Sequence, residues 1–208
     1  MMKVLTFNGS PHLHGCTDRA LRELENTLKE NGIEVERIEI GNKDLRGCIA
    51  CNYCRTHGKC VFNDLVNETA PKFAAADGIV VGTPVYWAGA NGQPLAFLDR
   101  LFYSTMGTVD TAMKVGAAVI SSRRAGSTSA FDEINKYFTM NSMPVVSSTY
   151  WNEVHGHSAE EVEQDLEGLQ TMRNLGRNMA FLIRAIQAQK AATGIPEQEH
   201  TYFTSFFR

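Results

Sequence analysis

The sequence predicts a single α/β domain, residues 1–208, built on a doubly wound parallel sheet with helices on both faces. Short apolar runs alternate along the chain with longer amphipathic segments, which is the pattern of a parallel sheet whose strands are buried on both sides. The 208 residues are 43% hydrophobic and 21% charged. That composition suits one globular core and excludes a wholly disordered chain.

The first half of the chain predicts two strands and two helices, with a cysteine-rich loop after the second strand. Residues 33–40 alternate apolar and charged side chains, which is typical of a strand near a sheet edge. Residues 47–60 hold too much cysteine and glycine for regular structure. The predicted elements are a strand over 3–7, a loop over 9–16, a helix from Thr17 to the stop signal Asn31-Gly32, the strand over 33–40 and a helix over 64–76.

The second half predicts three more strands, a long last helix and a C-terminal arm. Ser158-Ala159-Glu160-Glu161 is a capping box that opens the last helix, which runs to about Lys190. The arm, residues 192–208, is apolar enough to cover the core or to form a subunit contact through Tyr202, Phe203, Phe206 and Phe207. The remaining elements are strands over 77–83, 114–121 and 144–147 and helices over 91–106 and 127–141. Five such strands fit the flavodoxin-like order 2-1-3-4-5.

Three loops are expected to meet at one ligand site, since ligands of such sheets bind beyond the carboxyl ends of the strands, at the switch point. The loop after the first strand offers a phosphate backbone N–H groups, the positive end of a helix dipole and the hydroxyls of Ser10 and Thr17. Its glycine spacing is that of neither a P-loop nor a G-x-G-x-x-G loop, which favours a phosphate monoester over a pyrophosphate. The alternative is a turn that binds nothing.

The loops after the third and fourth strands add aromatic surface and positive charge. Tyr86 and Trp87 can line a flat heterocycle, and the alternative is that they pack in the core or at an interface. Arg123 and Arg124 can stabilise an anionic ring, and the alternative is a solvated turn before a helix.

Together these loops resemble the NAD(P)H-dependent FMN reductase branch of the flavodoxin-like family, over residues 1–157. The matching motifs are Gly9-Ser10-Pro11, Gly15-Cys16-Thr17, Pro84-Val85-Tyr86-Trp87, Arg123-Arg124-Ala125-Gly126 and the run from Met143 to Gly156. The resemblance implies FMN, with its phosphate at residues 10–17 and its isoalloxazine at 84–89 and 122–126. At Cys16 the chain departs from the family, which often has asparagine there, and a thiol is the poorer donor.

The expected FMN contacts follow from this resemblance and from the carboxyl edge of the fifth strand. They are Ser10, His12, Gly15, Cys16, Thr17, Pro84, Val85, Tyr86, Trp87, Gly89, Ser122, Arg123, Arg124, Gly126, Asn152 and His155. Flavin reduction needs no acid–base side chain, so no catalytic residue is assigned.

Four of the five cysteines fall within 13 residues, as Cys48-x2-Cys51-x2-Cys54-x5-Cys60. Three thiolates at a spacing of three can wrap one face of a cubane, and the fourth can close it. Structural zinc more often uses two separated C-x2-C pairs. The spacing resembles that of the iron–sulfur flavoproteins, which implies a [4Fe–4S] cluster beside FMN. Zinc, free thiols or a labile disulfide remain the alternatives, and Cys16 is not expected to be a ligand.

The function expected from these features is that of an FMN-dependent oxidoreductase that takes electrons from NAD(P)H and passes them through FMN and a [4Fe–4S] cluster. The alternatives are a non-enzymatic electron carrier and a zinc-stabilised binding module. Expected partners are a small-molecule or protein electron donor or acceptor, and the resemblance suggests a homodimer or homotetramer.

Charge and hydropathy exclude other classes of function. A net charge of −3 gives no basic excess for nucleic acid. No apolar run reaches the roughly 18 residues of a membrane span, and the N-terminus lacks a signal-peptide apolar region. We therefore expect a cytoplasmic protein.

Overall fold

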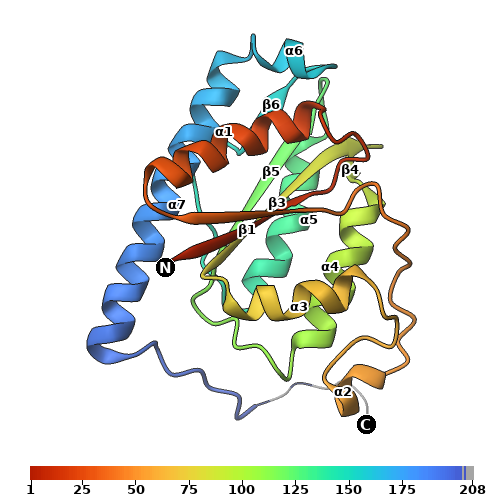
Figure 1. The fold of residues 1–208 in the computed structure, drawn as a ribbon, viewed down its shortest axis with the longest axis vertical. Helices are drawn as coiled ribbons and strands as arrows, with labels where there is room; N and C mark the ends of the chain where they lie inside the picture. Colours follow the sequence, from red (N-terminus) through yellow and green to blue (C-terminus); the bar gives the residue numbers. More distant parts are fainter. Residues whose placement is uncertain (203, 205–208) are drawn as a thin grey trace.

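The computed structural model describes residues 1–202 and Thr204, which form a parallel sheet between two layers of helices (Figure 1). The strands lie in the order β2-β1-β3-β5-β6, which confirms the predicted flavodoxin-like order once the short β4, an antiparallel partner of β3, is set aside. The strands are β1 (Lys3–Asn8), β2 (Glu34–Glu39), β3 (Gly78–Tyr86), β4 (Gly89–Ala90), β5 (Val115–Ser122) and β6 (Glu153–His155).

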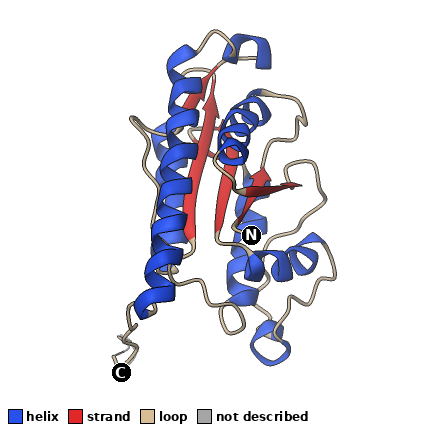
Figure 2. Cartoon of the chain, turned by 60° about the vertical axis from the view of Figure 1, so that its left-hand side comes forward, coloured by secondary structure: helices blue, strands red, loops and turns tan. Residues whose placement is uncertain are grey.

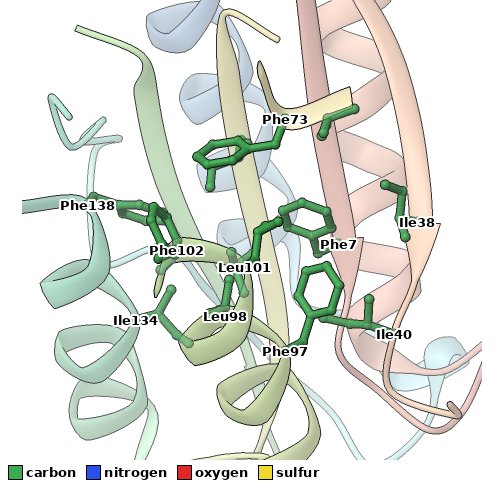
Figure 3. Close-up of a cluster of buried hydrophobic side chains, with 14 of the residues drawn as sticks. Phe7, Ile38, Ile40, Phe73, Phe97, Leu98, Leu101, Phe102, Ile134 and Phe138 are labelled. Atoms are coloured by element: carbon green, nitrogen blue, oxygen red, sulfur yellow. The ribbon is translucent and has the colours of Figure 1, made fainter. Parts of the chain in front are cut away.

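Two hydrophobic clusters fill the spaces on the two faces of the sheet, because successive strand residues point to opposite sides. Leu5 and Phe7 of β1 face one cluster, and Val4 faces the other. Figure 3 shows the first cluster, where Phe7 lies 5.3 Å from Phe97 between ring centroids. Its helices are α3 (Leu65–Ala75), α4 (Gly92–Thr105) and α5 (Ser127–Met140).

The second face is covered by α1 (Cys16–Glu30) and α7 (Leu166–Thr193), with the short α6 (Ala159–Val162) beside them. Figure 2 shows α7 running along the whole height of the sheet. This confirms that the C-terminal helix covers the core. No helix among residues 1–202 is both long and apolar enough to cross a bilayer.

Three local predictions are wrong. The fifth strand is not 144–147, which contributes only the bridge of Val145 to Gly116, but β6, which pairs with the carboxyl end of β5. The last helix is broken into α6 and α7 at residues 163–165, because Asp165 caps a new helix by accepting from Gly168 N–H. The cysteine segment contains a helix, α2 (Tyr53–His57), stabilised by a stacked Tyr53–His57 pair. Of the two alternatives for the arm, Tyr202 does not follow the first, since it is 93% exposed and does not cover the core, and the subunit contact stays a prediction. The predictions for Phe203, Phe206 and Phe207 lie outside the described residues.

Candidate functional site

A cavity of about 620 Å³ opens at the carboxyl ends of the central strands, where the sequence places the ligand site. Its size lies within the usual range of cofactor pockets, roughly 300–1,000 Å³. Three predicted loops meet in it, and ten of the expected contacts line it: Ser10, His12, Gly15, Cys16, Thr17, Pro84, Val85, Tyr86, Ser122 and Arg123.

The loop between β1 and α1 presents backbone N–H groups to this cavity. Ser10 is anchored beneath it, since its backbone N–H donates to Asn8 Oδ1 at 3.1 Å and its Oγ accepts from His12 N–H at 3.1 Å. Gly15 is the N-cap of α1 and supplies no side-chain hydrogen bond to the first turn. The 15-residue helix therefore directs its positive dipole end and its first N–H groups into the cavity, which suits a phosphate.

Two serines at the end of β5 form the floor of the cavity. Ser121 Oγ lies 2.7 Å from Thr17 Oγ1, which ties the floor to α1. Ser122 is 5% exposed, and its Oγ has no hydrogen-bond partner in the part of the chain that the structure describes. A buried hydroxyl without a partner costs about 1–3 kcal/mol unless a ligand satisfies it. The donor set therefore fits a polar, phosphate-bearing cofactor such as FMN.

One wall of the cavity comes from the hairpin between β3 and β4. Its turn residues, Trp87 and Ala88, have φ values of +52° and +61°. Two contacts hold this strained turn: Glu133 Oε2 accepts from Ala90 N–H at 2.9 Å, and the backbone of Gly126 lies against Ala88. Pro84, Val85 and Tyr86, the last residues of β3 before the turn, line the cavity.

Six expected contacts do not line the cavity. Trp87 is fully exposed at the tip of the hairpin, and Gly126 supports the hairpin from behind. Asn152 is 1% exposed, and its Oδ1 accepts from Ser148 Oγ at 2.7 Å, so it stabilises the loop before β6. The others are Gly89, Arg124 and His155.

The sequence reasoning missed the wall that follows β6. That wall carries Gly156, His157, Ser158, Ala159 and Glu160, and the lining also includes Leu13, His14 and Ser121. Cys16 Sγ donates to Gly156 O at 3.4 Å, which joins this wall to α1, and burial raises the pKa of the Cys16 thiol. The signal for this wall was the capping box at Ser158, which places a helix start directly after the last strand.

The four clustered cysteines line a second, much smaller hollow. Cys48, Cys51, Cys54 and Cys60 surround it, and α4 backs it with Arg100, Tyr103 and Ser104. Tyr103 O accepts from Cys54 Sγ at 3.9 Å, and Tyr103 OH donates to Asn52 Oδ1 at 3.0 Å. Arg100 Nε and Nη2 each lie 3.3 Å from Cys60 Sγ.

The spacing of these thiols bears on what they can bind. Among residues 1–202 and Thr204, no three His, Cys, Asp or Glu side chains gather closely enough for a single metal ion. One zinc ion needs every sulfur about 2.3 Å from the same point. A cubane binds each thiolate at a different iron, and it therefore accepts a wider ring of sulfurs. The donor set, four free thiols around one hollow, has the chemistry that a cluster requires.

The two sites are separate. No residue lines both. In Figure 1 α2, beside the cysteines, lies at the bottom of the molecule, whereas α6 lies at the top and β4 in the upper half. Helix α4 runs from one site toward the other. Its N-cap Asn91 donates from Nδ2 to Gly9 O at 2.8 Å beside the cavity, and Arg100 reaches the hollow.

Comparison with known proteins agrees with this geometry. Residues 2–158 match the model of the NADPH-dependent FMN reductase family. An iron–sulfur flavoprotein of Methanocaldococcus jannaschii is 36% identical over 89% of this chain and 100% of its own length. One of Methanosarcina thermophila is 29% identical over 91% of this chain and 99% of its own.

Solved structures share the fold. RosB, with the bound intermediate 8-demethyl-8-formylriboflavin-5'-phosphate, superposes with a TM-score of 0.73 at 14% identity and covers 100% of this chain and 95% of its own. A flavodoxin from the domain Archaea gives a TM-score of 0.61 at 15% identity, over 88% of this chain and 99% of its own. The loops, the cavity and the relatives agree, and the chain belongs to the NADPH-dependent FMN reductase family, in its iron–sulfur flavoprotein branch, as an FMN-dependent oxidoreductase.

Proposed function

We propose that this oxidoreductase takes electrons from NAD(P)H and passes them through FMN and a [4Fe–4S] cluster to a small-molecule or protein acceptor. The observation that carries the proposal is the presence, in one chain, of a phosphate-suited cavity and a separate hollow lined by all four clustered cysteines. The names of the relatives, iron–sulfur flavoproteins, support the same combination.

The chain's own residues would bind and orient the flavin. The first turn of α1 and Ser10 would hold the phosphate, and the buried Ser122 hydroxyl would gain a partner. Tyr86 and Val85 would form a wall beside the ring, while Arg123 would place positive charge near it. Bound FMN supplies the chemistry, acceptance of a hydride and release of single electrons, and the protein supplies placement and charge.

Cys48, Cys51, Cys54 and Cys60 would hold the cluster, one thiolate at each iron. Cys48 and Cys51 are exposed, so electrons could leave for an acceptor at this surface, while Cys54 and Cys60 lie closer to α4. Cys16 lies in the other cavity and would take no part.

The test is a spectrum of protein purified without oxygen, with iron, acid-labile sulfide and flavin assayed on the same sample. We expect flavin bands, a broad shoulder at about 400 nm and about four irons per chain, as four thiolate ligands to one cubane require. Flavin without iron would reduce the proposal to a simple FMN reductase. Saturable oxidation of NADH or NADPH would identify an enzyme, and its absence would leave an electron carrier.

Two cysteine variants make the test specific. Cys51→Ser should lose most of the iron and keep the flavin, because Cys51 lines the hollow and does not line the flavin cavity. Cys16→Ser is the matched control for iron, because it changes a thiol that lines the flavin cavity and not the hollow, and it should keep the iron. Equal iron in the two variants would contradict the cluster assignment.

A further inference from the structure

Arg100 is the largest fully buried side chain of the described residues, at 1% exposure. Taking a guanidinium out of water is costly unless anions and acceptors surround it. Asp64 supplies part of this, with Oδ2 at 2.8 Å from Nη1 and Oδ1 at 2.8 Å from Nη2. Arg46 O accepts from Nη1 at 3.3 Å, and the Phe62 ring lies 5.0 Å away.

The remaining donors of Arg100 point at sulfur. Nε and Nη2 both lie 3.3 Å from Cys60 Sγ, so the planar fork grips one sulfur atom with two N–H groups. A neutral thiol is a weak acceptor, whereas a metal-bound thiolate is anionic and accepts strongly. Two donors aimed at one sulfur are the arrangement that a ligated thiolate would need.

The position of Arg100 also fixes the Cys60 loop to the scaffold. Arg100 lies on α4, and its partner Asp64 is the N-cap of α3, where Oδ1 also accepts from Val66 N–H at 3.1 Å. Cys60 N–H donates to Asn67 Oδ1 of α3 at 2.9 Å. The Cys60 sulfur therefore lies between α3 and α4, and contacts from both helices fix the residue.

We propose that Arg100 is a positioning residue that orients the Cys60 sulfur and, through its two N–H···S contacts and its charge, raises the reduction potential of the cluster. Hydrogen bonds to ligand sulfurs and nearby charge are the main levers by which a protein sets such potentials. Asp64 opposes the effect, because its carboxylate balances the charge of Arg100. The inference rests on the proposed cluster.

The test is a redox titration of anaerobically purified protein, with the reduced cluster followed by electron paramagnetic resonance. Arg100→Gln removes the charge and one side of the fork, so its midpoint potential should be more negative than that of the wild type. Arg100→Lys keeps the charge with fewer donors, and its potential should lie between the two. Asp64→Asn keeps Arg100 and removes the opposing charge, so its potential should be more positive.

Two controls distinguish an effect of the Arg100 charge on the potential from a general disturbance of the structure. Arg46→Gln removes an exposed guanidinium over the same Phe62 ring, 4.7 Å from its centroid. Its shift in potential should be smaller than that of Arg100→Gln, because solvent and salt screen an exposed charge. The flavin potential of every variant should also be unchanged, because Arg100 does not line the flavin cavity. If Arg100→Gln fails to fold, Arg100→Lys and Asp64→Asn still test the proposal, because their midpoint potentials should shift in opposite directions.

The outcomes are distinct. Equal potentials in wild type, Arg100→Lys and Asp64→Asn, or shifts of the same sign in the last two, would overturn the role of Arg100 while the cluster stands. Wild-type protein that contains flavin but no iron or sulfide would overturn the cluster and this inference together.

Discussion

Buried polar side chains on β1, β2 and α1 form a network at the scale of single residues. Arg37 pairs with Asp18 and Glu25, and Thr6 Oγ1 donates to Glu25 at 2.5 Å. Glu39 stands at the end of β2, and its Oε2 is buried with no partner among the described residues. Burial raises the pKa of Glu39 above its usual value of 4.5. A charge at this position therefore costs stability instead of adding to it.

Glu39→Gln should stabilise the protein at neutral pH and change nothing in acid. Because the native pKa of Glu39 lies above its unfolded value near 4.5, the wild type loses free energy of unfolding as pH rises from that value through the raised native pKa. The amide does not titrate, so the difference between the proteins should open over that window. Urea unfolding at pH 4 and pH 7 measures it. A variant that is less stable than wild type at pH 7 would show that Glu39 has a favourable partner.

The β3–β4 hairpin shows at the scale of elements how neighbours maintain a conformation that its own sequence disfavours. A two-residue turn with positive φ at both positions favours Asn-Gly, yet this one is Trp87-Ala88. Gly126, with φ of +93°, lets the β5–α5 loop approach so closely that an added Cβ would lie 2.7 Å from Ala88 Cα. The hairpin wall of the cavity thus depends on a glycine almost 40 residues later.

Gly126→Ala should destabilise the protein by about 1–2 kcal/mol, since a side chain at positive φ is strained and the new Cβ also meets the hairpin. It should weaken FMN binding as well, because the wall that carries Tyr86 moves. Thermal unfolding and flavin titration measure the two effects. Gly92→Ala is the matched control. Gly92 has no positive φ, and an added Cβ would have no neighbouring atom within 4 Å, so this variant should behave as wild type.

Which elements could be predicted depended on how local their causes are. The strands over 3–7, 77–83 and 114–121 and the loops after them followed from apolar runs and glycine, all read within a few residues. The prediction of the fifth strand was wrong because two nearby segments, around Val145 and Val154, are both apolar. Only the pairing with β5 determines that residues 153–155 form the strand. The role of Arg100 could not be predicted from the amphipathic pattern of its helix, since its partner Asp64 is 36 positions away in the sequence.

At the scale of the whole molecule, the distance between the two sites makes association important. The candidate FMN cavity and the cysteine hollow share no lining residue, and α2, beside the cysteines, lies at the other end of the molecule from α6 in Figure 1. Electrons cross protein only over short gaps. A second copy could bring the hollow of one chain near the cavity of another. Trp87, fully exposed on a fixed turn, is an apolar group suited to such a contact.

We therefore expect a homodimer or homotetramer. Light scattering of the purified protein should give about two or four times the chain mass of 23.0 kDa. Trp87→Ala should shift the distribution toward the single chain and leave the circular dichroism spectrum unchanged, because the side chain has no packing to lose. A single-chain mass at all concentrations would contradict the expectation.

The contacts of the cysteine segment with the rest of the fold determine whether the segment can be transferred between related proteins. The segment leaves the sheet after β2 ends at Glu39 and returns at α3, which begins at Leu65, so its loss or gain leaves the strand order intact. Its hold on the scaffold, however, includes Arg100 and Tyr103, which belong to α4. To transfer the cysteine segment into a homologue that binds only flavin, one would therefore have to introduce Arg100 and Tyr103 of α4 as well.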